Sequence, residues 1–147
     1  MDRIAQADDV ICGQVESGIV QRVYLMDRHF PSDGIKPFLD VCSARGKGIF
    51  NLVRTSNPSA GELQDLELAD GRKVYEAMAD MVNEWGKDLI GECGFSSVGA
   101  VVGATWPEQA VEARKRMPHA LILVPGYGAQ GAGADNAVAS FTADGKG

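Results

Sequence analysis

The sequence is poor in the features that mark several classes of protein. Basic residues are in the minority, with 14 Lys and Arg against 20 Asp and Glu, for a net charge of −6. No basic run stands out, which argues against nucleic acid or an anionic membrane surface as a partner. No apolar stretch approaches the roughly 20 residues that span a bilayer, and the N-terminus lacks the layout of a secretion signal. We therefore expect a cytoplasmic chain that binds a small metabolite.

Cysteine and histidine are also scarce. Cys12, Cys42 and Cys93 are widely spaced and form no C-x-x-C pair, and His29 and His119 are the only histidines. This set does not predict a metal site, and the cysteines are expected to be reduced thiols, buried or incidental. Each histidine lacks a nucleophile or acid partner in the sequence, so a surface or capping role is expected.

The residues that are present suit one folded domain. Hydrophobic residues make up 45% of the chain and charged residues 23%, the balance of a globular protein. Residues 1–31 show no clear period, and Asp27-Arg28-His29 place three polar residues where a buried strand would finish. We therefore divide the chain into an N-terminal segment of unclear pattern, 1–31, and an α/β domain, 32–147.

Strand and helix patterns alternate through the second part. Short apolar runs predict strands buried on both faces at 48–53, 97–103 and 120–124. Amphipathic spacing predicts helices at 34–45, 74–89 and 107–116. Capping-box spacing links Ser59 with Glu62 and Thr105 with Glu108. The carboxylates between the first strand and the second helix are predicted to form a solvated face: Glu62, Asp65, Glu67 and Asp70.

This alternation indicates a parallel sheet with helical crossovers, either a barrel or an open sheet. A complete eight-unit barrel takes about 250 residues, so a barrel here would be partial. Parallel α/β folds bind ligands at the carboxyl ends of their strands, which directs attention to the three following loops. In the first loop, Thr55, Ser56 and Asn57 could hydrogen-bond a polar ring edge, although such residues also suit ordinary turns and caps.

The third loop, Pro125-Gly-Tyr-Gly-Ala-Gln-Gly131, is the strongest local signal. Its glycines leave backbone N–H groups free to approach an anion, so phosphate is the natural ligand. Gly126, Gly128 and Gly131 also match a dinucleotide-binding fingerprint, with Asp144 near the spacing of a ribose-binding acid. That alternative is disfavoured because no strand pattern follows the loop. A purely structural glycine loop is the other alternative.

Three linked segments also carry a resemblance to a known family. They are Lys47–Leu66, Ser97–Thr105 followed by Pro107–Ala110, and Leu123–Gly131. In order and spacing they resemble the longer bacterial branch of the orotidine 5′-phosphate decarboxylases. The resemblance covers 32–147 and implies about strand units five to seven of a (β/α)8 TIM-type barrel.

The resemblance implies a carboxy-lyase of pyrimidine biosynthesis that converts orotidine monophosphate to uridine monophosphate without a metal or organic cofactor. Ser56 would contact the pyrimidine, and Gln130 would bridge the pyrimidine side and the 5′-phosphate. The loop that begins at Pro125 would shape the phosphate pocket. Full-length members are expected to be homodimers. The substrate-binding residues implied in this way are Thr55, Ser56, Pro125, Gly126, Gly128 and Gln130.

The sequence also departs from the family pattern. The catalytic array of the family, Asp-x-Lys-x-x-Asp, is not found, and Asp33-Gly-Ile-Lys36 followed by Asp40 has a different spacing on a predicted helix. No catalytic residue is therefore assigned. The phosphate-gripping arginine of the eighth strand unit and the Thr-Val-Asn-Pro-Tyr strand end are also missing. We expect a truncated member without activity of its own; the alternatives are a non-catalytic phosphate-binding half-barrel and the product of a frame-shifted gene.

Overall fold

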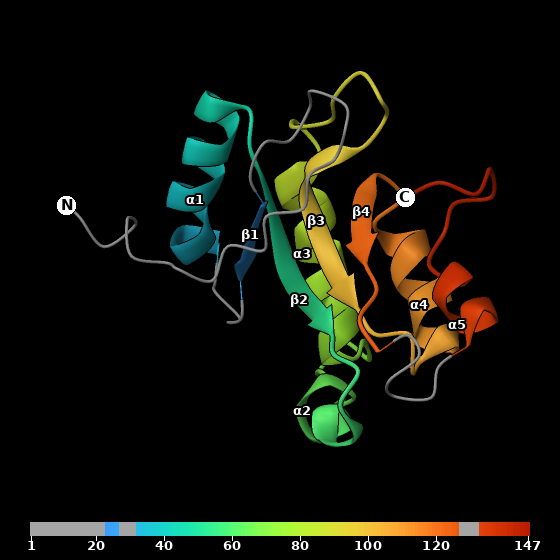
Figure 1. Ribbon diagram of the computed structural model, residues 1–147. Coiled ribbons are helices and arrows are strands. Elements are labelled where there is room, and N and C mark those ends of the chain that lie inside the picture. Colours follow the sequence, from blue (N-terminus) through green and yellow to red (C-terminus); the bar gives the residue numbers. More distant parts are fainter. Residues whose placement is uncertain (1–22, 27–31, 127–132) are drawn as a thin grey trace.

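A computed structural model describes residues 23–26, 32–126 and 133–147. Four parallel strands form one sheet, and the longer helices cover one of its faces (Figure 1). The elements in chain order are β1 (Val23–Met26), α1 (Ser32–Arg45), β2 (Gly48–Arg54), the 3-10 turn η2 (Pro58–Ala60), α2 (Gly61–Gln64), α3 (Val74–Gly86), β3 (Ser96–Val102), α4 (Pro107–Arg116), β4 (Ala120–Leu123) and α5 (Ala134–Val138).

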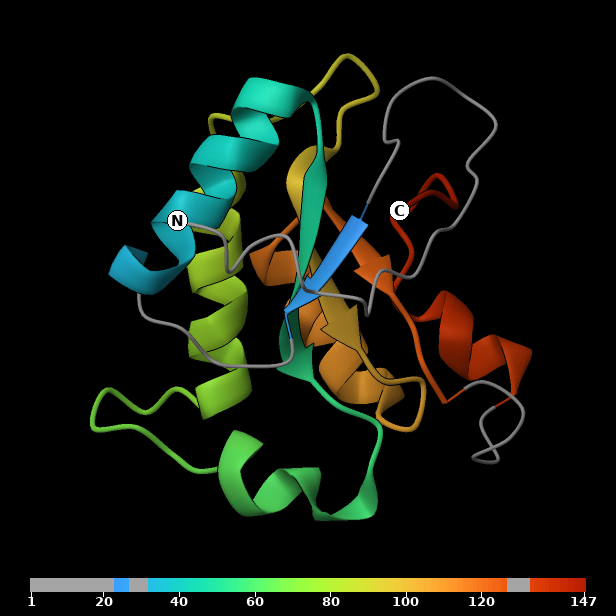
Figure 2. The ribbon, with the colours of Figure 1, turned by 60° about the vertical axis from the view of Figure 1, so that its left-hand side comes forward.

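The order of the strands in the sheet is their order in the chain, β1-β2-β3-β4, and every neighbouring pair is parallel. Ile49 stands beside Val98, and Ala100 stands beside Ile122. The three strands predicted from apolar runs are thus confirmed as parallel neighbours joined through helices. Turned by 60°, the ribbon shows α1 and α3 along the same face of the sheet (Figure 2). None of the helices in the described residues is long and apolar enough to cross a membrane.

Strand β1 was missed by the sequence analysis, which found no pattern in residues 1–31. It pairs with β2 from Val23 beside Gly48 to Met26 beside Asn51. Only four residues long, β1 is followed at once by Asp27-Arg28-His29. A run this short offers too few positions for a period to emerge, and its pairing with β2 is a tertiary contact that local pattern does not contain.

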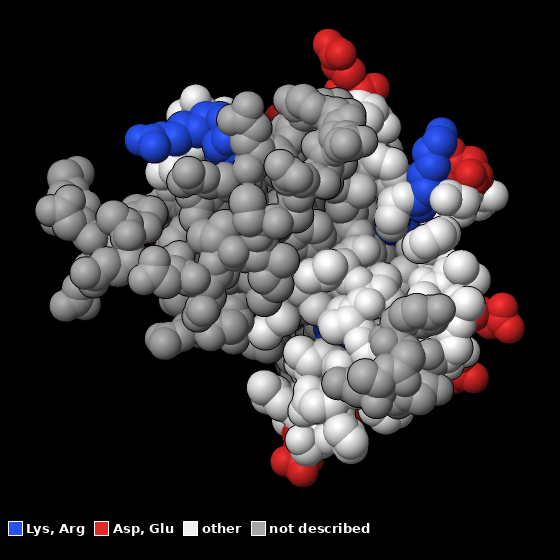
Figure 3. Space-filling view, in the orientation of Figure 1, with Lys and Arg blue, Asp and Glu red and all other residues white. Residues whose placement is uncertain are grey.

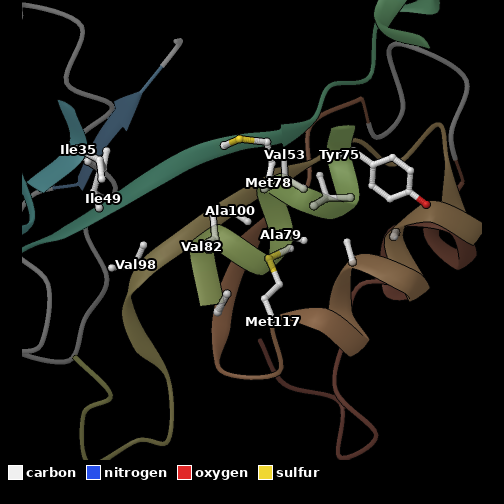
Figure 4. Packing of buried hydrophobic residues seen from close by; sticks show 14 of the residues in the cluster. Ile35, Ile49, Val53, Tyr75, Met78, Ala79, Val82, Val98, Ala100 and Met117 are labelled. Carbon is white, nitrogen blue, oxygen red and sulfur yellow. The ribbon is translucent and has the colours of Figure 1, made fainter. Parts of the chain in front are cut away.

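The core lies between the helices and the sheet. Alternate strand residues such as Ile49, Val53 and Val98 point into it and are at most 1% exposed, and they pack with Val82 from α3 and with Met117, the residue after α4 (Figure 4). Burying each side chain of this size stabilises the fold by about 1.5–3 kcal/mol. The strands are therefore fixed along their length, which holds the loops at their ends in place.

The opposite face of the sheet is also largely uncharged. Phe50 lies across Gly99, where an added Cβ would stand 2.6 Å from the Phe50 ring and 2.9 Å from the Leu121 carbonyl oxygen. Gly99 thus allows a close approach between neighbouring strands that a larger residue would block. In the orientation of Figure 1, uncharged side chains cover much of the described surface, and charged side chains lie towards its rim (Figure 3).

Arg114 joins α4 to the C-terminal part of the chain. Its guanidinium is buried and donates hydrogen bonds to the carbonyl oxygens of Ser140 and Ala120, both at 2.7 Å. Further bonds reach the carbonyl oxygens of Met117, Pro118 and Gly147. Burial lowers the pKa of Arg114. One side chain thus holds the end of α4, the start of β4 and the segment after α5 together.

Both predicted capping boxes are wrong. The N-cap of α4 is Trp106, without a side-chain cap bond, and the Thr105 hydroxyl donates to a carbonyl in another loop. The Ser59 hydroxyl accepts from Asn57, and the helix after it begins behind a 3-10 turn. In both places the hydroxyl is directed to a loop partner, as a donor at Thr105 and as an acceptor at Ser59, and not to a helix N–H group.

Candidate functional site

The loops that follow β2, β3 and β4 meet at the carboxyl edge of the sheet. The Thr105 hydroxyl donates to the Ser56 carbonyl oxygen at 3.0 Å, which ties the loop after β3 to the loop after β2. The Ala104 N–H donates to the Pro125 carbonyl oxygen at 2.9 Å, which ties the same loop to the one after β4. The middle loop therefore sets the separation between the two loops that the sequence singled out.

The contact between the first two loops requires a glycine. A Cβ built on Gly103 would lie 2.6 Å from Cα, 2.7 Å from N and 2.8 Å from Cβ of Ser56. The Gly103 N–H also donates to the Arg54 carbonyl oxygen at 2.7 Å. Because backbone lies against backbone here, any side chain at this position would displace the serine.

The polar side chains of the first loop differ in whether they already have hydrogen-bond partners. The Thr55 N–H donates to Gln64 Oε1 at 3.0 Å, and the Thr55 hydroxyl lies within 2.5 Å of Asn57 Oδ1 and 3.3 Å of Gln64 Oε1. The Asn57 amide donates to the Ser59 hydroxyl. The Ser56 hydroxyl has no hydrogen-bond partner among residues 32–126 and 133–147, and Ser56 is only partly buried. Of the three predicted side chains, Ser56 is thus the one available to a ligand.

A buried arginine stands at the base of this loop, and sequence reasoning missed it. Arg54, the last residue of β2, has a fully buried side chain. Its guanidinium donates to Gln64 Oε1 at 3.1 Å, to Asp65 Oδ2 at 3.0 Å and to Gln109 Oε1. Gln109 in turn donates to Asp65 Oδ1 at 3.1 Å, which closes a ring of three side chains.

The charge and stacking of Arg54 complete this cluster. Burial lowers the pKa of Arg54, and the neighbouring Asp65 carboxylate opposes that change. The guanidinium carbon lies 4.6 Å from the centre of the Trp106 ring, at the distance of a cation–π contact. The Trp106 Nε1–H is buried without a partner in the described part of the chain. The assignment of Asp65 to a solvated face is therefore wrong, because its carboxylate is paired with a buried charge.

The predicted phosphate loop is described only at its start. Pro125 and Gly126 follow β4, and Gly126 has φ +92°, a backbone conformation that favours glycine. Gly128 and Gln130 lie outside the described residues, so the structure does not test their predicted roles. The residues described after the loop contain the short helix α5 and no strand.

Asp144, the acid in the dinucleotide alternative, is engaged locally. Its carboxylate accepts a hydrogen bond from the Thr142 hydroxyl at 2.5 Å and pairs with Lys146 at 2.9 Å. These contacts, the threonine bond first, lower the pKa of Asp144 to about 2. With no strand after the loop in the described residues, this acid does not occupy the second strand end that a ribose-binding acid of that fold uses.

The other sequence candidates lie elsewhere. Lys36 is on α1 and forms an exposed ion pair with Asp40 at 2.7 Å, as its placement on a predicted helix suggested. His119 is exposed with Nδ1 3.0 Å from the Gly94 carbonyl oxygen, which confirms the expected surface role. Cys42 is buried and Cys93 is exposed, both as free thiols. No group of three or more potential metal ligands occurs within the described ranges. Cys12 and His29 lie outside the described residues.

Known proteins share this sequence and fold. The profile of the Orotidine 5′-phosphate decarboxylase / HUMPS family matches residues 29–145. The orotidine 5′-phosphate decarboxylase of Rhodopirellula baltica is 52% identical over 115 residues, which are 78% of this chain and 38% of that protein. The enzyme of the same name from Clostridium tetani is 35% identical, covering 100% of this chain and 57% of that protein.

Solved structures of orotidine-monophosphate decarboxylases also resemble this chain in fold. An orotidine-monophosphate decarboxylase structure from Toxoplasma gondii has a TM-score of 0.74 at 35% identity, over 85% of this chain and 47% of the other. The OMP decarboxylase of Leishmania donovani has a TM-score of 0.61 at 35% identity, over 79% and 41%. The chain thus spans between 38% and 57% of the length of the relatives named here. With the family profile matched over residues 29–145, this protein belongs to the orotidine 5′-phosphate decarboxylase / HUMPS family.

Proposed function

We propose that this chain forms the part of an orotidine 5′-phosphate decarboxylase site that binds the pyrimidine and the phosphate. Its ligand would be orotidine or uridine monophosphate. Ser56 would hydrogen-bond the pyrimidine, and the loop that starts at Pro125 and Gly126 would surround the 5′-phosphate. Gly128 and Gln130 complete the proposal by family resemblance, with Gln130 bridging the two ends of the nucleotide.

The observation that carries this proposal is the joining of the two loops through one short segment. Ser56 and Pro125 each accept a hydrogen bond from neighbouring residues, Thr105 and Ala104. The first loop offers a hydroxyl for a ring edge, and the second offers glycine backbone for an anion. A ligand that spans both loops must therefore carry a polar ring at one end and an anionic group at the other, as a pyrimidine nucleotide does.

Binding and catalysis are separate requirements in this reaction. Loss of carbon dioxide leaves a carbanion on the pyrimidine ring, and its stabilisation needs a fixed cationic donor in a preorganised site. Among the described residues, Lys36 is exposed and paired with Asp40, and Arg54 is enclosed by Gln64, Asp65 and Gln109. We therefore infer that the chain by itself binds nucleotide without decarboxylating orotidine monophosphate at a useful rate.

The binding proposal is tested by titrating the purified chain with uridine monophosphate, followed by NMR chemical shifts. Uridine and ribose 5-phosphate serve as probes of the two halves of the ligand. Ser56→Ala removes one neutral hydrogen bond, so the dissociation constant for uridine monophosphate should rise about 2- to 12-fold. Ser43→Ala, which changes an exposed serine on α1, is the matched control and should leave it unchanged. Equal affinity of the wild-type chain for uridine and uridine monophosphate would contradict the proposal.

The catalytic part is tested separately. The chain is expressed in cells that lack their own decarboxylase, and growth is scored without uracil. In parallel, the purified chain is assayed for loss of orotidine monophosphate. We expect neither growth nor turnover. Turnover traceable to this chain would show that a cationic donor has been overlooked, and Lys36 and Lys47 would be the first residues to substitute.

Location, assembly and the division of the chain remain proposals. Family membership supports a cytoplasmic location and, for full-length members, a homodimer. Fractionation of the native cells and sedimentation of a full-length relative would measure the two. The boundary between 1–31 and 32–147 would be tested by limited proteolysis, which should cut first on the N-terminal side of α1.

A further inference from the structure

We propose that Arg54 is a positioning residue of the nucleotide site, which acts by holding the Thr55–Asn57 loop so that Ser56 faces the pyrimidine. This inference rests on the binding function proposed above and adds to it a residue that would itself not touch the ligand. Arg54 is the last residue of β2, its side chain is fully buried, and the loop begins at the next position.

The first step is the link from Arg54 to the loop backbone. Gln64 Oε1 accepts from Arg54 Nη1 at 3.1 Å and from the Thr55 N–H at 3.0 Å. Arg54 Nη1 also lies 3.4 Å from the Thr55 carbonyl oxygen. Arg54 Nη1 therefore holds Gln64 Oε1, which also accepts from the Thr55 N–H. The same nitrogen contacts the Thr55 carbonyl oxygen, which directly precedes Ser56. Without it, Gln64 would have no fixed orientation from which to hold Thr55.

The second step is the link from Arg54 to the loop after β3. Its Nε donates to Gln109 in the first turn of α4, and its Cζ lies over the Trp106 ring, 4.6 Å from the ring centre. Gln109 is held in turn by Asp65 Oδ1 at 3.1 Å. Thr105, next to Trp106, donates to the Ser56 carbonyl oxygen. Arg54 thus contacts both loops whose junction places Ser56.

The third step is that the geometry suits arginine and no other cation. The three guanidinium nitrogens each donate to a different side chain, Gln109, Gln64 or Asp65, and the guanidinium carbon lies over an indole ring. A planar fork with five N–H groups makes such a set, whereas a lysine ammonium reaches fewer partners and does not stack in this way. The arrangement therefore indicates rigid placement of a loop rather than charge compensation alone.

The test compares two ligands in the same variant. In Arg54→Met, the dissociation constant for uridine monophosphate should rise about tenfold, because the serine hydrogen bond is misaligned and the loop must be ordered on binding. The constant for ribose 5-phosphate, which has no pyrimidine, should change by less than about twofold. Arg45→Met alters an exposed arginine at the end of α1 and should change neither constant.

Two further variants keep the test decisive. Asp65→Asn preserves the side-chain shape if Arg54→Met folds poorly, and it should give a smaller loss with the same selectivity for uridine monophosphate. In the double variant Arg54→Met with Ser56→Ala, affinity should match that of Ser56→Ala alone, since residues that act through one group are not additive. Equal weakening of both ligands, or additive effects of the two substitutions, would overturn the positioning role.

A measurement without ligand separates this inference from the binding function. Amide hydrogen exchange of Thr55 and Gly103 should quicken in Arg54→Met, while Ala100 within β3 keeps its wild-type rate. Unchanged exchange at Thr55 would overturn the inference even if the chain binds uridine monophosphate. If exchange quickens but the wild-type chain does not prefer uridine monophosphate to uridine, the binding function fails and the site role of Arg54 fails with it.

Discussion

Gly103→Ala offers a sharp test of how the loops at the carboxyl edge are assembled. The added methyl carbon would stand 2.6 Å from the Ser56 Cα, and an ordinary contact begins at 3.4 Å. Because β3 is held by β2 and β4 on either side, the serine loop must move, by roughly 0.8 Å. That movement is enough to stretch the 3.0 Å bond from Thr105 to Ser56 beyond hydrogen-bonding distance.

The expected loss of stability follows from these contacts. Overpacking against backbone costs about 1–3 kcal/mol, and the lost hydrogen bond costs about 0.5–1.5 kcal/mol. Replacing glycine by alanine restricts the unfolded chain and offsets about 0.4–1 kcal/mol of this. The free energy of unfolding should therefore fall by about 0.5–4 kcal/mol, compared with the 5–15 kcal/mol typical of a domain.

The assay is urea unfolding followed by circular dichroism, with Gly91→Ala as the control. A Cβ on Gly91 would meet its nearest atom, the Phe95 carbonyl oxygen, at 3.8 Å, and the backbone there does not require glycine. That variant should be as stable as the wild type or slightly more stable. If Gly103→Ala unfolds at the same urea concentration as Gly91→Ala, the serine loop does not rest against β3 as described.

Three further predictions concern groups outside the loops. Arg114→Met should lower the free energy of unfolding by about 2–4 kcal/mol, because carbonyl oxygens including those of Ser140 and Ala120 lose a buried donor; an unchanged urea midpoint would refute this. Burial raises the pKa of Tyr75 to about 12, so the protonated phenol stabilises the fold below pH 10, and this contribution should decline between pH 10 and 12. Urea midpoints of Tyr75→Phe should lack that decline, and a parallel decline in both proteins would contradict it. Lys36→Met should shift the free energy of unfolding by less than about 0.5 kcal/mol and leave nucleotide binding intact, since the lysine belongs to an exposed ion pair.

Local periodicity was sufficient to predict most of the fold. The strands and long helices after residue 31 begin and end within a few positions of the predicted bounds, because each must present an apolar face to the core. Helix α3 ends at Gly86, before the predicted 89, where the Gly86 carbonyl oxygen accepts a hydrogen bond from the Ser96 hydroxyl at 2.9 Å. Contacts of this kind between distant segments have no local signature.

The site, like the fold, was predicted where the signal is local and missed where it depends on contacts between distant segments. Thr55, Ser56 and Asn57 were predicted because hydroxyl and amide side chains after a buried strand are visible in sequence. The Arg54 cluster was not, because Arg54 and Gln109 are 55 positions apart and the resemblance assigned a role to neither. One signal was present but weak: an arginine closing an otherwise apolar strand needs a buried partner, and Asp65 was the acid in reach.

The order of the strands in the sheet has a consequence for how the chain folds as it is synthesised. Since each strand pairs with the one made just before it, each new strand can join the sheet once the crossover that precedes it has been made, without waiting for segments further along the chain. The arginine cluster is completed later, because Gln109 belongs to α4, which is synthesised after β3. The bond from Arg54 to Gln109 would thus form only after β1, β2 and β3 have been made, when the first turn of α4 leaves the ribosome.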